Sequence, residues 1–169
     1  SYNQGQGLIM HRAASLPDNT EKKYHLVLKK IGDTFMDITK NRYEEQDETG
    51  DYYLFEKTYY KKSPWFGGYS YVDLLVEGVT EKFIQVTMTG YEKAIGPEFG
   101  KLVPGIFTDE PNINPPSGIK YTPSLFTDFS HQWGYDLKTN LPSLFAETGD
   151  WRRIRHNYYS LLLDLFIDR

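Results

Sequence analysis

The expected fold follows from residues 102–111, which read Leu102-Val103-Pro104-Gly105-Ile106-Phe107-Thr108-Asp109-Glu110-Pro111. The apolar run from Leu102 to Phe107 predicts a short buried strand. This strand would end in two adjacent carboxylates and a proline. The C-terminal ends of the strands form the active face of an α/β barrel, so a carboxylate pair at such an end indicates acid/base chemistry or sugar binding.

A helix precedes this strand, and a strand-like run at residues 69–75 precedes the helix. A strand–helix–strand order predicts two parallel strands joined by a helical crossover. Both strands would then end at the same edge of the sheet, so we expect residues 65–73 to lie beside Asp109 and Glu110. The helix ends at Gly96-Pro97. Its apolar stripe consists of Val79, Phe83, Val86, Thr87, Gly90 and Ala94.

The sequence before this unit is rich in β-type patterns. Residues 24–60 contain three such runs separated by turn sequences, which favours an antiparallel meander. The sequence after the unit predicts helices at 122–133, at 141–145 and from about 151 onward.

The expected fold class is therefore α/β: a segment of a (β/α)8 (TIM) barrel with an N-terminal antiparallel β-rich portion. We expect residues 1–64 to form a β-rich insertion or adjoining segment. Residues 65–169 are expected to form a partial barrel with the catalytic residues. The first residues show no signal-peptide pattern. Both ends of the sequence resemble truncation points, which favours a segment of a larger protein.

Composition argues against several classes of function. The net charge is −4, and no basic run is longer than a pair, which is unlike a nucleic-acid-binding protein. No stretch of about 18 apolar residues predicts a membrane span. There is no cysteine, and the four histidines lack zinc-ligand spacing, so neither thiol chemistry nor a metal site is predicted. No nucleotide-binding motif is present, so no cofactor is expected.

The carboxylate pair cannot by itself be the two catalytic groups of a glycosidase. Such enzymes hold two carboxyl groups about 5–5.5 Å apart when retaining and about 6.5–9.5 Å apart when inverting. Neighbouring residues of a strand point to opposite faces, so only one of the pair faces a substrate. We assign Glu110 as the acid/base or sugar-binding residue. Asp109 is then an orienting residue or a cation ligand, and the second carboxylate comes from elsewhere.

Aromatic residues make up 16% of the chain, and four residues near the first strand-like run complete the candidate site. Aromatic rings stack on sugars and carboxylates accept hydroxyl hydrogen bonds, so we predict substrate-binding roles. Four of the candidate residues have a structural alternative: Trp65 could fill one end of the fold, Asp73 could begin the next helix, Asp109 could cap a helix or turn, and Glu110 could be a surface group. The predicted substrate-binding residues are Trp65, Tyr69, Tyr71 and Asp73.

Several collinear motifs carry a family resemblance. They are Gly68-Tyr-Ser-Tyr-Val-Asp-Leu-Leu75, Val79-Thr-Glu-Lys-Phe-Ile84, Gly100-Lys-Leu-Val-Pro-Gly-Ile-Phe-Thr-Asp-Glu-Pro111, Thr122-Pro123, Trp133-Gly-Tyr-Asp-Leu137, Leu141-Pro-Ser-Leu-Phe145 and the helix with Arg155 and Tyr158-Tyr159. In this order, residues from about 65 to 169 resemble large bacterial TIM-barrel glycoside hydrolases. The most similar group is α-L-rhamnosidase family 106 with its uncharacterised relatives.

The resemblance implies a function for the larger enzyme. It implies hydrolysis of glycosidic bonds in plant-type polysaccharide, with α-L-rhamnosides as candidate substrates, by paired-carboxylate catalysis. It also implies a periplasmic or extracellular location, and it allows a calcium ion although no calcium loop is readable. Members of this group are several times longer than this chain, so the isolated chain is expected to be incomplete and to need the rest of a larger protein or self-association.

Two other functions remain open. The aromatic residues alone suit a non-catalytic carbohydrate-binding or interaction module. The chain is also consistent with an inactive fragment of a larger enzyme, whose exposed sheet edges a partner would cover.

Overall fold

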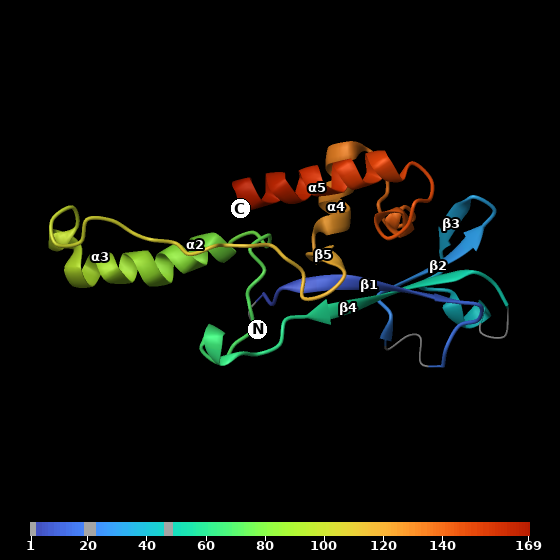
Figure 1. The fold of residues 1–169 in the computed structure, drawn as a ribbon, viewed down its shortest axis with the longest axis horizontal. Helices are drawn as coiled ribbons and strands as arrows, with labels where there is room; N and C mark the ends of the chain where they lie inside the picture. The colour runs from blue at the N-terminus through green and yellow to red at the C-terminus, as the bar shows by residue number, and fades with distance from the viewer. Residues whose placement is uncertain (1–2, 19–22, 46–48) are drawn as a thin grey trace.

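A curled, five-stranded antiparallel sheet forms the centre of the structure, a computed structural model that describes residues 3–18, 23–45 and 49–169 (Figure 1). The strand order is β3-β2-β4-β1-β5, and every neighbouring pair is antiparallel. The strands are β1 (Gln6–Ala13), β2 (Leu26–Ile31), β3 (Thr34–Asp37), β4 (Tyr52–Tyr59) and β5 (Ile119–Tyr121).

Successive side chains of the central strands face two different apolar clusters. In β4, Tyr53 and Phe55 join the cluster beneath the helices, whereas Tyr52 and Leu54 join the cluster on the other face. This follows from the alternation of side chains along a strand. The middle of the sheet is therefore buried on both faces.

Two helices cover one face of the sheet (Figure 1). They are α4 (Leu125–Trp133) and α5 (Trp151–Asp168), with the 3₁₀ turn η5 (Leu141–Leu144) between them. The expected ending of the first helix at Gly134 is confirmed, because this glycine adopts a left-handed conformation with φ of 74°. The helix predicted from residue 151 is also confirmed. Its buried residues are Ile154, Asn157, Tyr158, Leu161, Leu162 and Leu165.

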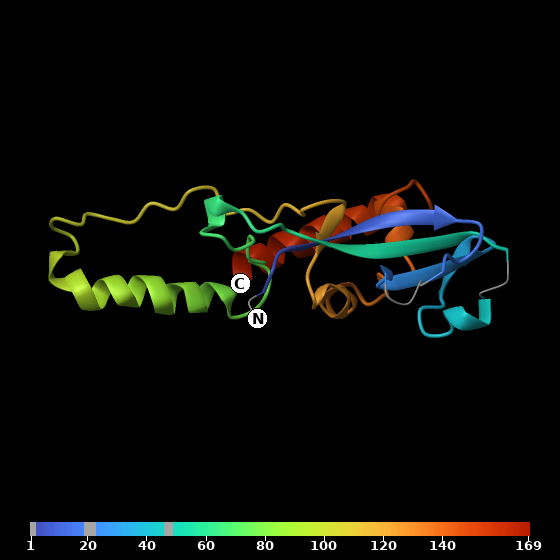
Figure 2. The ribbon, with the colours of Figure 1, turned by 90° about the horizontal axis from the view of Figure 1, so that it is seen from below.

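Residues 79–111 form an arm that projects away from the rest of the molecule (Figures 1 and 2). We call this segment the arm and the sheet with α4 and α5 the body. The outward half of the arm is a continuous helical run and the return half is extended, and none of the residues in its helices is buried. The helical run consists of α2 (Val79–Phe83), the π-helical turn η3 (Ile84–Met88), α3 (Thr89–Ile95) and η4 (Gly96–Glu98).

The expectation of a TIM-barrel segment is wrong. The sheet is antiparallel, and neither strand of the proposed parallel unit forms: residues 69–75 contribute only an isolated bridge between Gln4 and Val72. Residues 102–107 are not buried, since Ile106 is 70% exposed and Phe107 is 85% exposed. The apolar run has no neighbouring strand among the described residues, and a strand forms only where a partner supplies the hydrogen-bonded ladder.

The β-rich reading of residues 24–60 is confirmed in its strands but not in their order. Strands β2 and β3 form a hairpin, and β4 then pairs with β2 instead of β3. Strand β1 lies outside the three β-type runs expected at residues 24–60. It pairs with β4 over its full length, from Gln6 opposite Tyr59 to Ala13 opposite Tyr52.

A membrane span would need a longer and more apolar helix than any found in residues 3–18, 23–45 and 49–169.

Candidate functional site

Asp109 and Glu110 lie on the return half of the arm, where both side chains are exposed. Among the described residues, the backbone from 104 to 111 makes no backbone–backbone hydrogen bond. Glu110 has φ of 42° and is the one described non-glycine residue in the left-handed region. A side chain in this region costs roughly 1–2 kcal/mol, which glycine would avoid. This strain turns the chain at the carboxylate pair, directly before Pro111.

Tyr71 contacts the chain just after the carboxylate pair. Its hydroxyl oxygen accepts a hydrogen bond of 3.2 Å from the backbone N–H of Asn112, two residues after Glu110. The Tyr60 hydroxyl donates to the Asn114 carbonyl at 2.9 Å. The return of the arm is therefore fixed to the body immediately after the carboxylates.

These two tyrosines belong to a small aromatic cluster. The ring of Tyr71 lies 5.6 Å from that of Tyr60 and 5.3 Å from that of Phe66, measured between centroids. Tilted pairs at this separation are favourable beyond the area they bury. Sequence reasoning missed Tyr60 because it ends a strand-like run, where it gave no sign of holding a loop more than fifty residues later.

Trp65 and Tyr69 lie at the surface beside this cluster. Trp65 is 86% exposed and Tyr69 is 63% exposed. Trp65 belongs to η2 (Pro64–Phe66), which Ser63 caps and which Gly67 ends in a left-handed conformation. Trp65 therefore does not fill one end of the fold. Its exposed indole is suited to contact a ligand from solution.

Asp73 is fully buried, in contrast to the other predicted substrate-binding residues. Its carboxylate pairs with the ammonium of Lys120 at 2.8 Å and accepts the backbone N–H of Leu75 at 3.2 Å. Asp73 thus joins β5 to the segment that leads into the arm, and it has no surface to offer a sugar. Sequence reasoning missed Lys120, and only its position between Ile119 and Tyr121 in an apolar strand gave any signal.

The described residues contain no group of three or more His, Asp or Glu side chains placed to hold a metal ion. Asp109 and Glu110 form two carboxylates without a third protein ligand, which is fewer than a calcium ion takes from a dedicated protein site. The chemistry available at the arm is therefore that of exposed carboxylates next to an aromatic surface.

Comparisons with family models, with curated proteins and with solved structures found no match to this chain.

Proposed function

We propose that this chain contributes the acid/base carboxylate and part of the sugar-binding surface of a glycoside hydrolase acting on plant-type polysaccharide, with α-L-rhamnosides as candidate substrates. The observation that carries the proposal is the placement of Glu110. This residue keeps a strained backbone conformation, is accessible to solvent, and lies two residues before Asn112, whose backbone N–H donates to Tyr71 of the aromatic cluster. The collinear sequence resemblance supplies the reaction class.

Glu110 is the residue to which we assign proton transfer. Its carboxyl group would protonate the glycosidic oxygen or activate water, as in the two-carboxylate mechanism of these enzymes. Asp109, next to it, would orient the substrate or Glu110 itself. Strained backbone conformations concentrate at functional residues, and the strain at Glu110 fits this role.

The aromatic residues would bind the sugar. Trp65 and Tyr69 expose large ring areas, and Tyr71 holds the turn that follows the carboxylates. Ring faces stack against the C–H groups of a pyranose, while hydroxyl and indole N–H groups donate hydrogen bonds.

The second carboxylate is proposed to come from outside these 169 residues. The carboxylate of Asp73, which the sequence predicted to bind substrate, is instead occupied by its ion pair with Lys120. The exposed apolar residues of the arm support this reading, because a partner or further chain segment that covers them would lie beside Glu110.

A second function has its own supporting observation. The exposures of Trp65 and Tyr69 would also serve a non-catalytic carbohydrate-binding module, which needs no second carboxylate. Its sugar binding would survive the loss of the Glu110 carboxylate.

The test is hydrolysis of a panel of nitrophenyl glycosides, α-L-rhamnoside included. It would use the longest polypeptide that contains these residues, as wild type and as Glu110→Gln. Loss of a general acid or base reduces the rate by about 10²–10⁴-fold. The matched control is Glu92→Gln, which alters an exposed glutamate of α3 on the same arm. We expect this control to keep full turnover.

Three outcomes separate the proposals. A selective loss in Glu110→Gln supports catalysis at this residue. Equal turnover in both variants contradicts it. Absence of hydrolysis together with sugar binding that Glu110→Gln retains favours the binding module.

A further inference from the structure

A groove on the body, separate from the arm, lies between the β2–β3 hairpin and the start of α4. It has a volume of about 700 Å³, within the range of small-molecule sites. The hairpin side and the following turn supply Asp37, Thr39 and Asn41, and the helical side supplies Phe126 and Thr127. A second hollow of about 470 Å³ adjoins it and shares Phe126, Thr127 and Lys138 with it. The two hollows together suit a linear ligand longer than one ring.

Three aromatic side chains that line the groove, those of His25, Tyr121 and Phe126, contact one another. His25 lies 5.2 Å from the ring of Tyr121 and stacks at 6.4 Å on Phe126, with centroid distances quoted. His25 Nε2 and the Tyr121 hydroxyl are 3.0 Å apart and hydrogen-bonded. Burial, with help from the cations of Lys57 and Lys138, lowers the pKa of His25 to about 4. These aromatic groups are therefore uncharged at neutral pH and offer ring surface and neutral hydrogen-bonding groups.

The charges around the groove balance one another. Two carboxylates, of Asp37 and Glu44, and two ammonium groups, of Lys40 and Lys138, line the first hollow. The Lys138 ammonium lies 5.7 Å from the centroid of the Phe126 ring. Asn41 and Thr127 add neutral polar groups, whereas the Thr39 hydroxyl is already paired with the backbone N–H and carbonyl of Val27. An anionic ligand would meet as many like charges as opposite ones, so this lining does not select for anions.

We propose that this groove binds a neutral oligosaccharide, with Phe126 as its stacking surface and the polar groups of the β2–β3 side as its hydroxyl partners. A polyhydroxylated ring needs donors and acceptors together with apolar surface, and it gains nothing from net charge. The groove combines these features. Its two adjoining hollows extend the proposal to at least two sugar rings.

This inference rests on the proposed carbohydrate function and adds a binding site away from Glu110. The groove residues come from β2, β3, the following turn and α4, whereas Glu110 belongs to the arm. Neither hollow includes Asp109 or Glu110 among its lining residues. A polysaccharide chain held in the groove would stay attached to the protein between cleavage events.

The experiment is a calorimetric and NMR titration of the 169-residue chain with neutral xylo-, manno-, galacto- and rhamno-oligosaccharides, and with oligogalacturonate as the charged probe. The blocking variant Lys40→Trp places a bulky ring at the groove. Its matched control Lys62→Trp makes the same change at an exposed lysine that lines neither hollow. A third variant, Phe126→Leu, removes the ring and keeps apolar packing.

We expect at least one neutral oligosaccharide to bind, with Kd raised about tenfold or more by Lys40→Trp and by Phe126→Leu. Lys62→Trp should change Kd less than about twofold. Circular dichroism spectra like that of the wild type would show that each variant is folded. The shifted amide signals should belong to β2, β3 and α4.

Three results would overturn the inference: no binding of any neutral probe at ~10 mM, binding of oligogalacturonate alone, or binding that Lys40→Trp and Phe126→Leu leave unchanged. The proposed hydrolase function fails separately. Hydrolysis that survives Glu110→Gln contradicts that function while leaving a groove defined by Lys40→Trp intact. Hydrolysis that depends on Glu110, without oligosaccharide binding in the groove, supports the hydrolase function and contradicts the groove proposal.

Discussion

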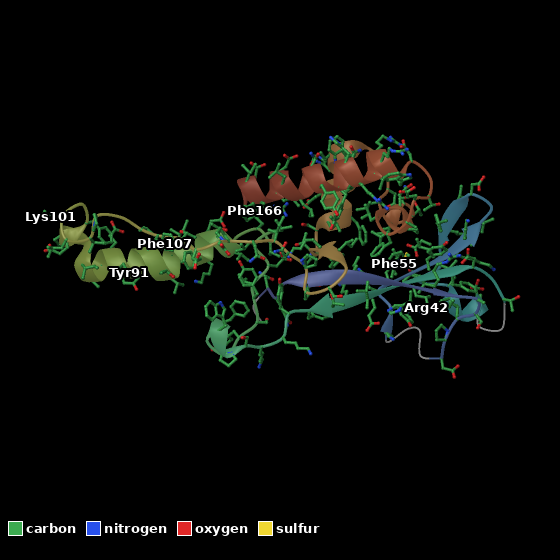
Figure 3. All side chains as sticks on the ribbon, viewed as in Figure 1. Arg42, Phe55, Tyr91, Lys101, Phe107 and Phe166 are labelled. Atoms are coloured by element: carbon green, nitrogen blue, oxygen red, sulfur yellow. The ribbon has the colours of Figure 1, made fainter. Side chains whose placement is uncertain are left out.

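The body and the arm use similar apolar side chains in opposite ways. In the body, Phe55 is fully buried between the sheet and η5, whereas on the arm Phe107 is 85% exposed (Figure 3). Tyr91 of α3 is 57% exposed and also lies on the arm. The outward half of the arm is helical like α4 and α5 of the body, but only the body has a core. An apolar sequence pattern thus stabilises the fold only where a partner surface covers it.

The exposed apolar area of the arm is itself informative. Monomeric proteins seldom show contiguous apolar patches beyond a few hundred Å², and larger patches indicate an interaction surface. The arm's large exposed apolar residues are Phe83, Ile84, Val86, Tyr91, Ile95, Phe99, Leu102, Ile106 and Phe107. Their number supports the proposal that the arm functions against another surface.

The largest expected contrast is between two phenylalanines. Phe55→Ala removes a fully buried ring and should lower the free energy of unfolding by about 3–5 kcal/mol. Phe107→Ala should change it by less than about 0.5 kcal/mol, because the ring is already in solvent. Urea unfolding of both variants measures the difference. Equal losses would show that the arm is covered in solution.

Two glycines give a smaller contrast. A Cβ at Gly118, where φ is 71°, would collide with the backbone carbonyl of Leu8, so Gly118→Ala should cost about 2–4 kcal/mol. Gly100 on the arm has φ of 76° with nothing within 4 Å, so Gly100→Ala should cost only about 1 kcal/mol. Thermal unfolding followed by circular dichroism would rank them. The reverse order would mean that the tip of the arm is packed and the β1–β5 contact is loose.

The smallest contrast is between a buried and an exposed tyrosine of α5, Tyr158 and Tyr159. Tyr158 is buried and donates its hydroxyl to the Lys120 carbonyl at 2.7 Å, and burial raises its pKa. Tyr158→Phe leaves that acceptor unpaired and should cost about 1–2 kcal/mol. Tyr159→Phe, at the neighbouring exposed position, should be neutral. Chemical denaturation at neutral pH distinguishes the two, and a larger cost at Tyr159 would indicate a covered outer face of α5.

The sequence predicted elements whose signals are local. Apolar spacing and the stops at Gly96-Pro97 and Gly134 predicted helices that the structure has at 79–95, 125–133 and 151–168, although the second was expected to begin at 122. Strand pairing depends on distant segments, so the antiparallel order and β1 were not predicted. The apolar run at 102–107 indicated burial without indicating what would bury it.

The candidate site was predicted to a similar degree. Tyr71 contacts Asn112, two residues after Glu110, through an anchored loop and not through the parallel strands on which the expected neighbourhood depended. Asp73 was misjudged because its partner Lys120 arrives from β5, far along the chain. The groove at His25 is lined by residues that precede the arm in the sequence and by residues that follow it, so no single motif predicts it.

The buried pair of Asp73 and Lys120 has a topological consequence. Asp73 precedes the arm and Lys120 follows it, so their ion pair holds the two ends of the arm together on the body. A short linker in place of residues 79–111 would connect the same two segments, and the entropic free-energy cost of closing the loop would be lower by roughly 1 kcal/mol. The body can therefore fold with the arm, residues 79–111, replaced by another segment.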